Sequence, residues 1–201
     1  MKPTVTLMHE HEMILMVLAA AEREVKSAKE RGALLAEKVQ KMLDFFGEFV
    51  DRCHHTKEEK YLFIRMQERG MSSEDWSIVV MLHEHEMGRQ LVKNMAEMLP
   101  LTEGGSSGAK SDNMSNDSDL CCGVTNKGAT AEVVDNLTAY VQQLRDLISK
   151  EDNVLYVMAD KIFTPEDQQE LERAFKKFEE EEIGIGVYEK YRQLAHEIAE
   201  S

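Results

Sequence analysis

The chain has 201 residues, of which 42% are hydrophobic and 31% charged, as is typical of a globular protein with a hydrophobic core. Its formal net charge of -14 argues against nucleic acid and anionic membrane as partners. The sequence lacks both an apolar run near the roughly 20 residues of a membrane span and a signal-type segment at its start, so we expect a cytoplasmic protein.

Glycine and proline are scarce in most of the chain, and this scarcity predicts an all-α fold. Apolar residues recur with helical spacing in six segments, at about residues 5–31, 34–69, 72–99, 131–163, 165–182 and 188–199. Gly32, Gly70 and Pro100 are expected to end the first three helices. Two further signals mark helix starts: Ser72 and Asp75 have capping-box spacing, and Thr164 is expected to be an N-cap before Pro165.

The third and fourth helices are separated by a stretch rich in Gly, Ser, Asn and Asp, which predicts a polar, mobile loop at 101–130. The loop carries Cys121 and Cys122, for which a redox or metal-capturing role stays an alternative, whereas Cys53 is expected to be a small core residue. We predict a single domain over 1–201, with residues 164–201 as a C-terminal helical extension.

An internal repeat organises the long helices. The string HEHEM occurs at residues 9–13 and again at 83–87, and HHTKEEKYLF (54–63) aligns with LISKEDNVLY (147–156). Two helical hairpins related by a pseudo-twofold axis would bring the four motifs together in an antiparallel four-helix bundle.

Histidine and glutamate lie on the apolar faces of these helices, where burial without a partner would cost several kcal/mol each. The residues on these faces are His11, His54, Glu58, His85 and Glu151. A single histidine of this kind is usually a hydrogen-bonded core residue, but the repeated set predicts a di-iron or di-manganese centre. His9, His83 and His55 lie about 100° or more around their helices and are expected outside the ligand set, with His55 and Glu59 as an alternative pair.

These motifs resemble the hemerythrin-like proteins, also called HHE cation-binding domains. The resemblance rests on EHE in the first helix, HHTKEEKYLF, MLHEHEMGRQLV, SKEDNVLYVMAD and FEEEEIGIGVYEKYRQL, in this order. It implies an antiparallel bundle around a non-haem site with two iron ions, although the ligand types also allow Mn or Zn. The ligands carried over by motif position are His11, His54, Glu58, His85 and Glu151.

The sequence departs from the family pattern at two positions. Leu147 stands where related proteins have a histidine, and Tyr188 stands where long-form members have another. Three outcomes are open: one iron keeps an empty coordination position, Tyr188 supplies a phenolate as replacement ligand, or the site binds one ion or none.

The resemblance implies a protein that binds or senses O2 or NO, or a related small oxidant. We expect no fused effector domain, so a sensor would need a separate partner. One alternative is an enzyme of oxidative or nitrosative stress that removes peroxide or donates iron for repair. Another is a degenerate bundle with a structural role. Ligand identity does not choose among them, because the surroundings of the metal set its reactivity.

Overall fold

The computed structural model describes residues 1–72, 76–102 and 126–201. Every regular element within these ranges is a helix, so the predicted all-α class is confirmed. Three sequence expectations lie outside the described residues: the cap at Asp75, the polar loop for most of its length, and the roles of Cys121 and Cys122. Within the same ranges, no helix is long and apolar enough to cross a membrane.

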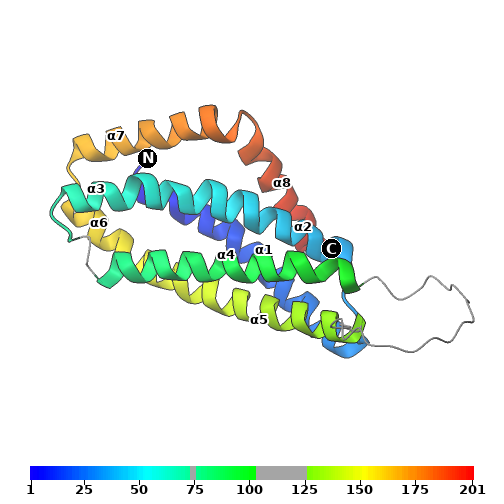
Figure 1. Ribbon diagram of the computed structural model, residues 1–201. Helices are drawn as coiled ribbons and strands as arrows, with labels where there is room; N and C mark the ends of the chain where they lie inside the picture. Colours follow the sequence, from blue (N-terminus) through cyan, green and yellow to red (C-terminus); the bar gives the residue numbers. More distant parts are fainter. Residues whose placement is uncertain (73–75, 103–125) are drawn as a thin grey trace, which may run out of the picture.

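Four long helical rods form the body of the molecule and lie side by side (Figure 1). The first rod is α1 (Pro3–Arg31) and the third is α4 (Trp76–Thr102). The second rod consists of α2 (Ala36–Asp44), η1 (Phe45–His55), η2 (Glu58–Leu62) and α3 (Phe63–Glu68). The fourth rod consists of α5 (Asn126–Lys150), η3 (Glu151–Leu155) and α6 (Tyr156–Ile162).

The helix ends follow from local sequence, with one exception. Gly32 adopts a left-handed conformation (φ 72°), and its N–H donates to the carbonyl of Ala28, which closes α1. The predicted stop before Pro100 was wrong, because α4 continues to Thr102. Near a helix end, proline removes a single backbone hydrogen bond, and the Thr102 hydroxyl donates to the carbonyl of Leu99 at 2.7 Å.

Two of the rods contain π-helical segments, η1 and η2 in the second rod and η3 in the fourth. The sequence pattern predicted uninterrupted α-helices there. A π-helix bonds each residue to the fifth along the chain and turns less per residue, so neighbouring side chains share a face more readily. Such segments occur frequently at functional sites, and here they carry His54, His55, Glu58 and Glu151.

The C-terminal segment packs along the second rod and α1. It consists of α7 (Pro165–Phe178), η4 (Glu179–Ile183) and α8 (Val187–Glu200). Thr164 caps α7 in a capping box with Asp167, as the TPED sequence predicted for the cap. Arg65 of α3 donates to Asp167, and Arg23 of α1 donates to the carbonyl of Ala199 at 2.7 Å.

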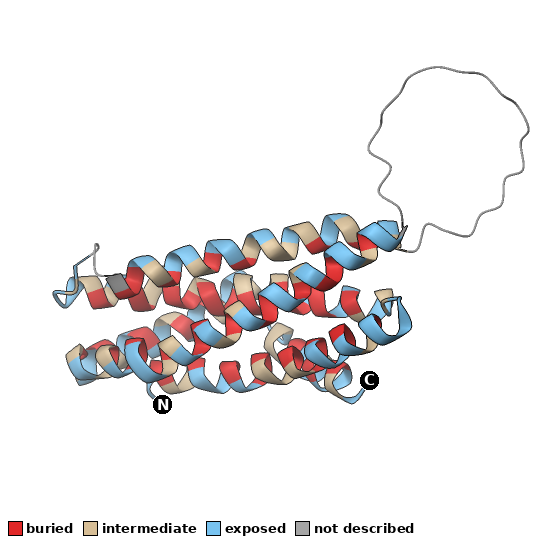
Figure 2. Cartoon of the chain, turned by 90° about the horizontal axis from the view of Figure 1, so that it is seen from below, coloured by how far each residue is buried: buried red, intermediate tan, exposed pale blue. Residues whose placement is uncertain are grey.

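Buried side chains lie mainly on the faces that the helices turn toward one another (Figure 2). The apolar core includes Phe45, Phe46 and Phe49 of η1 and runs along the rods. Cys53 is buried within it, as expected. The polar groups described next are embedded in this apolar core, so each must find a partner there.

Candidate metal centre

Six ligand-type side chains converge at the middle of the rods. They are His11 of α1, His54 and His55 of η1, Glu58 of η2, His85 of α4 and Glu151 of η3. None is more than 4% exposed. They form two groups that could each hold a metal ion, with one ligand atom per residue and all atoms of a group within 4.8 Å of one another.

The first group contains His11, His54, Glu58 and Glu151, and the second contains His55, Glu58 and His85. Glu58 is common to both. The structure therefore brings together all five side chains that the core pattern selected, and adds His55 to them.

Glu151 lies between the two groups. Its Oε2 is 3.3 Å from Nε2 of His11, and its Oε1 is 3.4 Å from Nε2 of His85. Glu58 occupies a similar position, because its Oε2 lies 3.6 Å from Nε2 of His54 and 3.5 Å from Nε2 of His85. Carboxylates placed in this way have the arrangement of bridging ligands in a two-metal site.

A carboxylate holds the outer nitrogen of three of the imidazoles. The Nδ1–oxygen pairs are His11–Asp152 at 2.8 Å, His54–Glu10 at 2.9 Å and His85–Glu59 at 2.7 Å. Metal-ligating histidines typically donate their second N–H in this way, which fixes the tautomer and leaves the other nitrogen for the ion. Accordingly, Nε2 of each of the three rings points toward Glu58 or Glu151.

Two of these outer carboxylates, Glu10 and Glu59, are themselves held by cations. Lys57, which is fully buried, donates to Glu10 and also to Glu179 of η4 at 2.7 Å. Arg89 of α4 donates to Glu59. The supporting hydrogen bonds thus extend from the imidazoles to the C-terminal segment and to the surface of α4.

The carboxylates around His11 and His85 raise the pKa values of both rings. Burial would lower the pKa of each ring, but hydrogen bonds with Glu151 and with the outer carboxylates outweigh burial and raise both to about 10. Burial would likewise raise the pKa of Glu151, yet hydrogen bonds from the same two imidazoles keep it far below its ordinary value. A cation bound at Nε2 of His11 and His85 would displace the protons there, since metal binding releases protons from its ligands.

The pKa values of the other two rings, His54 and His55, are lowered. Burial and the neighbouring His11 lower the pKa of His54 well below its ordinary value, and burial together with His85 lowers that of His55 to about 4. Burial and the nearby charge of Glu151 raise the pKa of Glu58 to about 8. Neutral imidazole is the form that ligates metal.

Several polar atoms in the centre lack a hydrogen-bond partner among the described residues. They are Oε2 of Glu58 and both ring nitrogens of His55. Buried polar atoms of this kind normally have a partner. A cation would satisfy the carboxylate oxygen and one ring nitrogen, and imidazole with carboxylate suits iron, manganese and zinc. The residues present therefore fit a metal.

The tyrosine at this site is Tyr156, which sequence reasoning did not select. Its hydroxyl donates to Oε1 of Glu58 at 2.6 Å and lies 3.4 Å from Nε2 of His11. Tyr188 is half-buried and packs edge-on against Phe49, with ring centroids 5.7 Å apart. Among the described residues, no hydrogen bond joins Tyr188 to a candidate ligand.

The remaining candidates divide as follows. His9 and His83 are exposed, as expected. Among the candidate ligands, Glu59 forms a hydrogen bond with His85 alone. Leu147 is buried in the apolar core. His55 was expected outside the ligand groups, and the structure instead places it in the second group. The expectation assumed α-helical winding of 100° per residue, whereas His54 and His55 end a π-helical segment.

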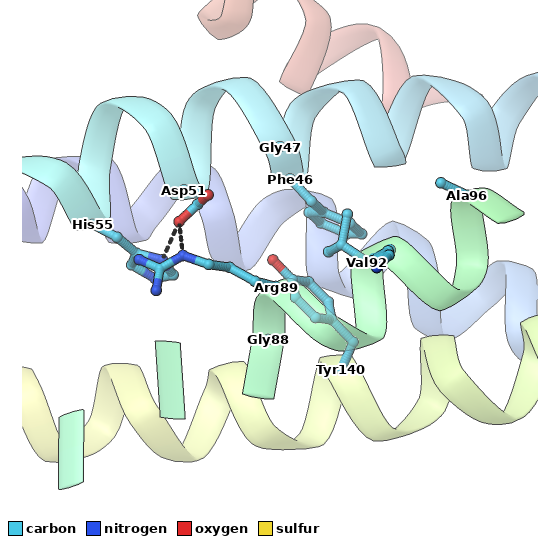
Figure 3. A pocket seen from close by; sticks show the side chains of 10 residues that line it. Phe46, Gly47, Asp51, His55, Gly88, Arg89, Val92, Ala96 and Tyr140 are labelled. Carbon is cyan, nitrogen blue, oxygen red and sulfur yellow. Dashed lines mark hydrogen bonds and ion pairs between the residues drawn. The ribbon is translucent and has the colours of Figure 1, made fainter. Parts of the chain in front are cut away.

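A pocket of about 180 Å³ leads from the surface to His55. Gly47, Gly88, Val92 and Tyr140 are among its lining residues. Figure 3 shows Asp51 at the His55 end, in contact with both His55 and Arg89. The pocket is the right size for a small molecule, and it reaches the second ligand group.

The hemerythrin HHE cation-binding domain model matches residues 2–159. No match was found among curated proteins or among solved structures. The matched range contains all six converging side chains and ends before α7.

Proposed function

Because the chain belongs to the hemerythrin HHE cation-binding family, we propose that it holds two iron ions and uses them to bind or sense a small molecule such as O2 or NO. In this proposal His11 and His54 ligate one ion, His85 ligates the other, and Glu58 and Glu151 bridge them. The donor atoms alone would also accept manganese or zinc. The proposed framework is an antiparallel four-helix bundle made of two pseudo-repeated hairpins.

One observation carries the proposal: buried imidazoles turn Nε2 inward while a carboxylate holds Nδ1. His11, His54 and His85 all have this arrangement. A histidine that served packing alone would need one hydrogen bond, not a common orientation toward two shared carboxylates. The arrangement is that of preorganised metal ligands.

The pocket that ends at His55 supports a small ligand. A volume of about 180 Å³ is ample for a diatomic molecule. Iron bound at the centre would supply the electron exchange that binding of O2 or NO requires. The chain contributes a pocket wall that includes Phe46 and Val92 and, at its inner end, the ion pair of Arg89 with Asp51 at 2.7 Å.

The test is a visible spectrum of the iron-loaded, reduced protein before and after addition of O2, and separately of NO. We expect a spectral change that reverses when the gas is removed, because binding or sensing leaves the protein unaltered. Glu132→Ala, an exposed position on α5, is the matched control and should behave like the wild type. Iron release, or catalytic consumption of peroxide without reversible binding, would contradict the proposal and favour an enzyme.

A further inference from the structure

The repeat leaves the second ligand group one imidazole short. Leu147 occupies the place that corresponds to His54, one turn before Glu151 on the same rod. It is 1% exposed and packs in the apolar core, so it offers no ligand atom. If only the positions aligned by the repeat supplied ligands, the ion on the His85 side would have a single imidazole.

His55 lies where the missing imidazole is needed. Its ring stacks on that of His85, with centroids 3.8 Å apart and planes at 12°. Ligand atoms of His55, His85 and Glu58 lie within 4.8 Å of one another. The π-helical winding at the end of η1 lets two consecutive residues serve different groups, with His54 in the first and His55 in the second.

His55, like the other three imidazoles, has a carboxylate beside Nδ1, although at a longer distance. Its Nδ1 faces a carboxylate, that of Asp51, at 3.6 Å. Asp51 is held by Nε of Arg89 at 2.7 Å, just as Glu10 is held by Lys57. Each of the four rings is therefore backed by a carboxylate. Lys57 holds Glu10, and Arg89 holds both Glu59 and Asp51.

An ordinary core histidine would be hydrogen-bonded, and His55 is not. Neither of its ring nitrogens has a hydrogen-bond partner in the described parts of the chain, even though the residue is buried, with only 4% of its surface exposed. Oε2 of Glu58, which belongs to the same group, also lacks a partner there. An imidazole nitrogen and a carboxylate oxygen without partners in one buried group form an incomplete coordination shell.

We propose that His55 replaces the imidazole that is absent at Leu147, so that His55, His85, Glu58 and Glu151 hold the second ion. This inference rests on the proposed function, since it assigns a ligand within the same metal centre. The chain thereby keeps four imidazoles for two ions, with two of them from adjacent residues of one π-helical segment. The pocket beside His55 then opens onto the second ion.

The direct test is the metal content of His55→Leu, with His83→Leu on the exposed face of α4 as the matched control. Leucine fills a buried position without offering a ligand atom, as Leu147 does in the second half of the repeat. We expect His55→Leu to fall from about two ions per chain to about one, and His83→Leu to stay at the wild-type value. Adding Leu147→His to His55→Leu should restore the second ion.

Full metal content in a folded His55→Leu protein would overturn the assignment. A wild-type protein that binds less than about half an ion per chain would instead overturn the proposed function itself. A third readout needs no variant at positions 54 to 58: wild-type protein labelled with [15N]histidine and loaded with 113Cd²⁺. One-bond coupling is expected for the rings of His11, His54, His55 and His85, and its absence for His55 would overturn the inference even if His55→Leu did not fold.

Discussion

The hydroxyl of Tyr156 donates to Oε1 of Glu58 at 2.6 Å and leaves Oε2 of that carboxylate facing His54 and His85. The hydrogen bond fixes which oxygen of Glu58 is available to an ion. Tyr156 itself is 2% exposed, and burial together with the charge of Glu58 raises its pKa well above the ordinary value, so it stays a donor.

Tyr156→Phe should therefore retain the fold and weaken metal binding by about tenfold, since removal of a group that orients a ligand typically costs 10–100-fold in affinity. Titration with Fe²⁺ or Zn²⁺ against a competing chelator measures the change. Tyr188→Phe is the control, because Tyr188 packs against Phe49 and not against the ligands. Equal losses in the two variants would show that the Tyr156 hydroxyl does not position Glu58.

Glu151→Ala should abolish stable metal binding, because the substitution removes the carboxylate that lies between His11 and His85. The same change also removes the carboxylate that pairs with Nε2 of both buried imidazoles. We expect a loss of about 3 kcal/mol in the free energy of unfolding at pH 7. Denaturation in urea measures that loss, and Glu132→Ala on the exposed face of α5 should stay within about 0.5 kcal/mol of wild type. A comparably small effect of Glu151→Ala would show that the carboxylate has no structural or metal-binding role.

Asp167 couples the C-terminal segment to α3. Its carboxylate accepts from Arg69 at 2.7 Å and from the backbone N–H of Thr164 at 2.9 Å, and these bonds hold its pKa below the ordinary value. A lowered folded-state pKa contributes stability above about pH 4, and this contribution is lost as the pH falls below that value.

Asp167→Asn should therefore destabilise the protein at pH 7 by about 1 kcal/mol, the typical value of a helix cap, and the difference from wild type should shrink toward pH 2. Thermal unfolding across that pH range measures both effects. Gln168→Asn, one residue farther along α7, is the control for the substitution itself. A difference that stays constant with pH would contradict an ionised, bonded Asp167.

Val92 lines the pocket that reaches His55. Val92→Phe should fill part of the 180 Å³ and slow the association of NO with the iron-loaded protein by about tenfold, while metal content stays unchanged. Stopped-flow absorbance measures the rate. Val157→Phe, at a position of α6 that is 43% exposed, adds the same ring outside the pocket and should leave the rate unaltered. An unchanged rate in Val92→Phe would show that small molecules reach the centre by another route.

The helical class and five of the six converging side chains were predictable because they follow one regularity. His11 and His85 recur on apolar stripes with α-helical spacing, and His54 with Glu58 are one turn apart. A polar residue on such a stripe must find a buried partner. The match of the family model to residues 2–159 agrees with this interpretation.

The rest of the centre depends on local departures from that regularity. His55 was expected outside the ligand set, and the structure places it beside Glu58 and His85, because its π-helical segment does not wind as an α-helix does. Tyr156 looked like a core aromatic, since a hydroxyl that reaches a carboxylate on another rod leaves no trace in sequence spacing. Lys57 is fully buried between Glu10 and Glu179. Lys57 and Glu179 are 122 positions apart in the sequence, and the packing of η4 on the second rod brings them into contact.

Elemental analysis of the wild-type protein after iron-replete expression tests the central claim most directly. The proposed ligand set, with two carboxylates and four buried imidazoles, predicts about two iron ions per chain, lost together in Glu151→Ala and reduced to about one in His55→Leu. A wild-type content below about half an ion per chain, in protein that is folded and has had access to iron, would contradict the di-iron centre.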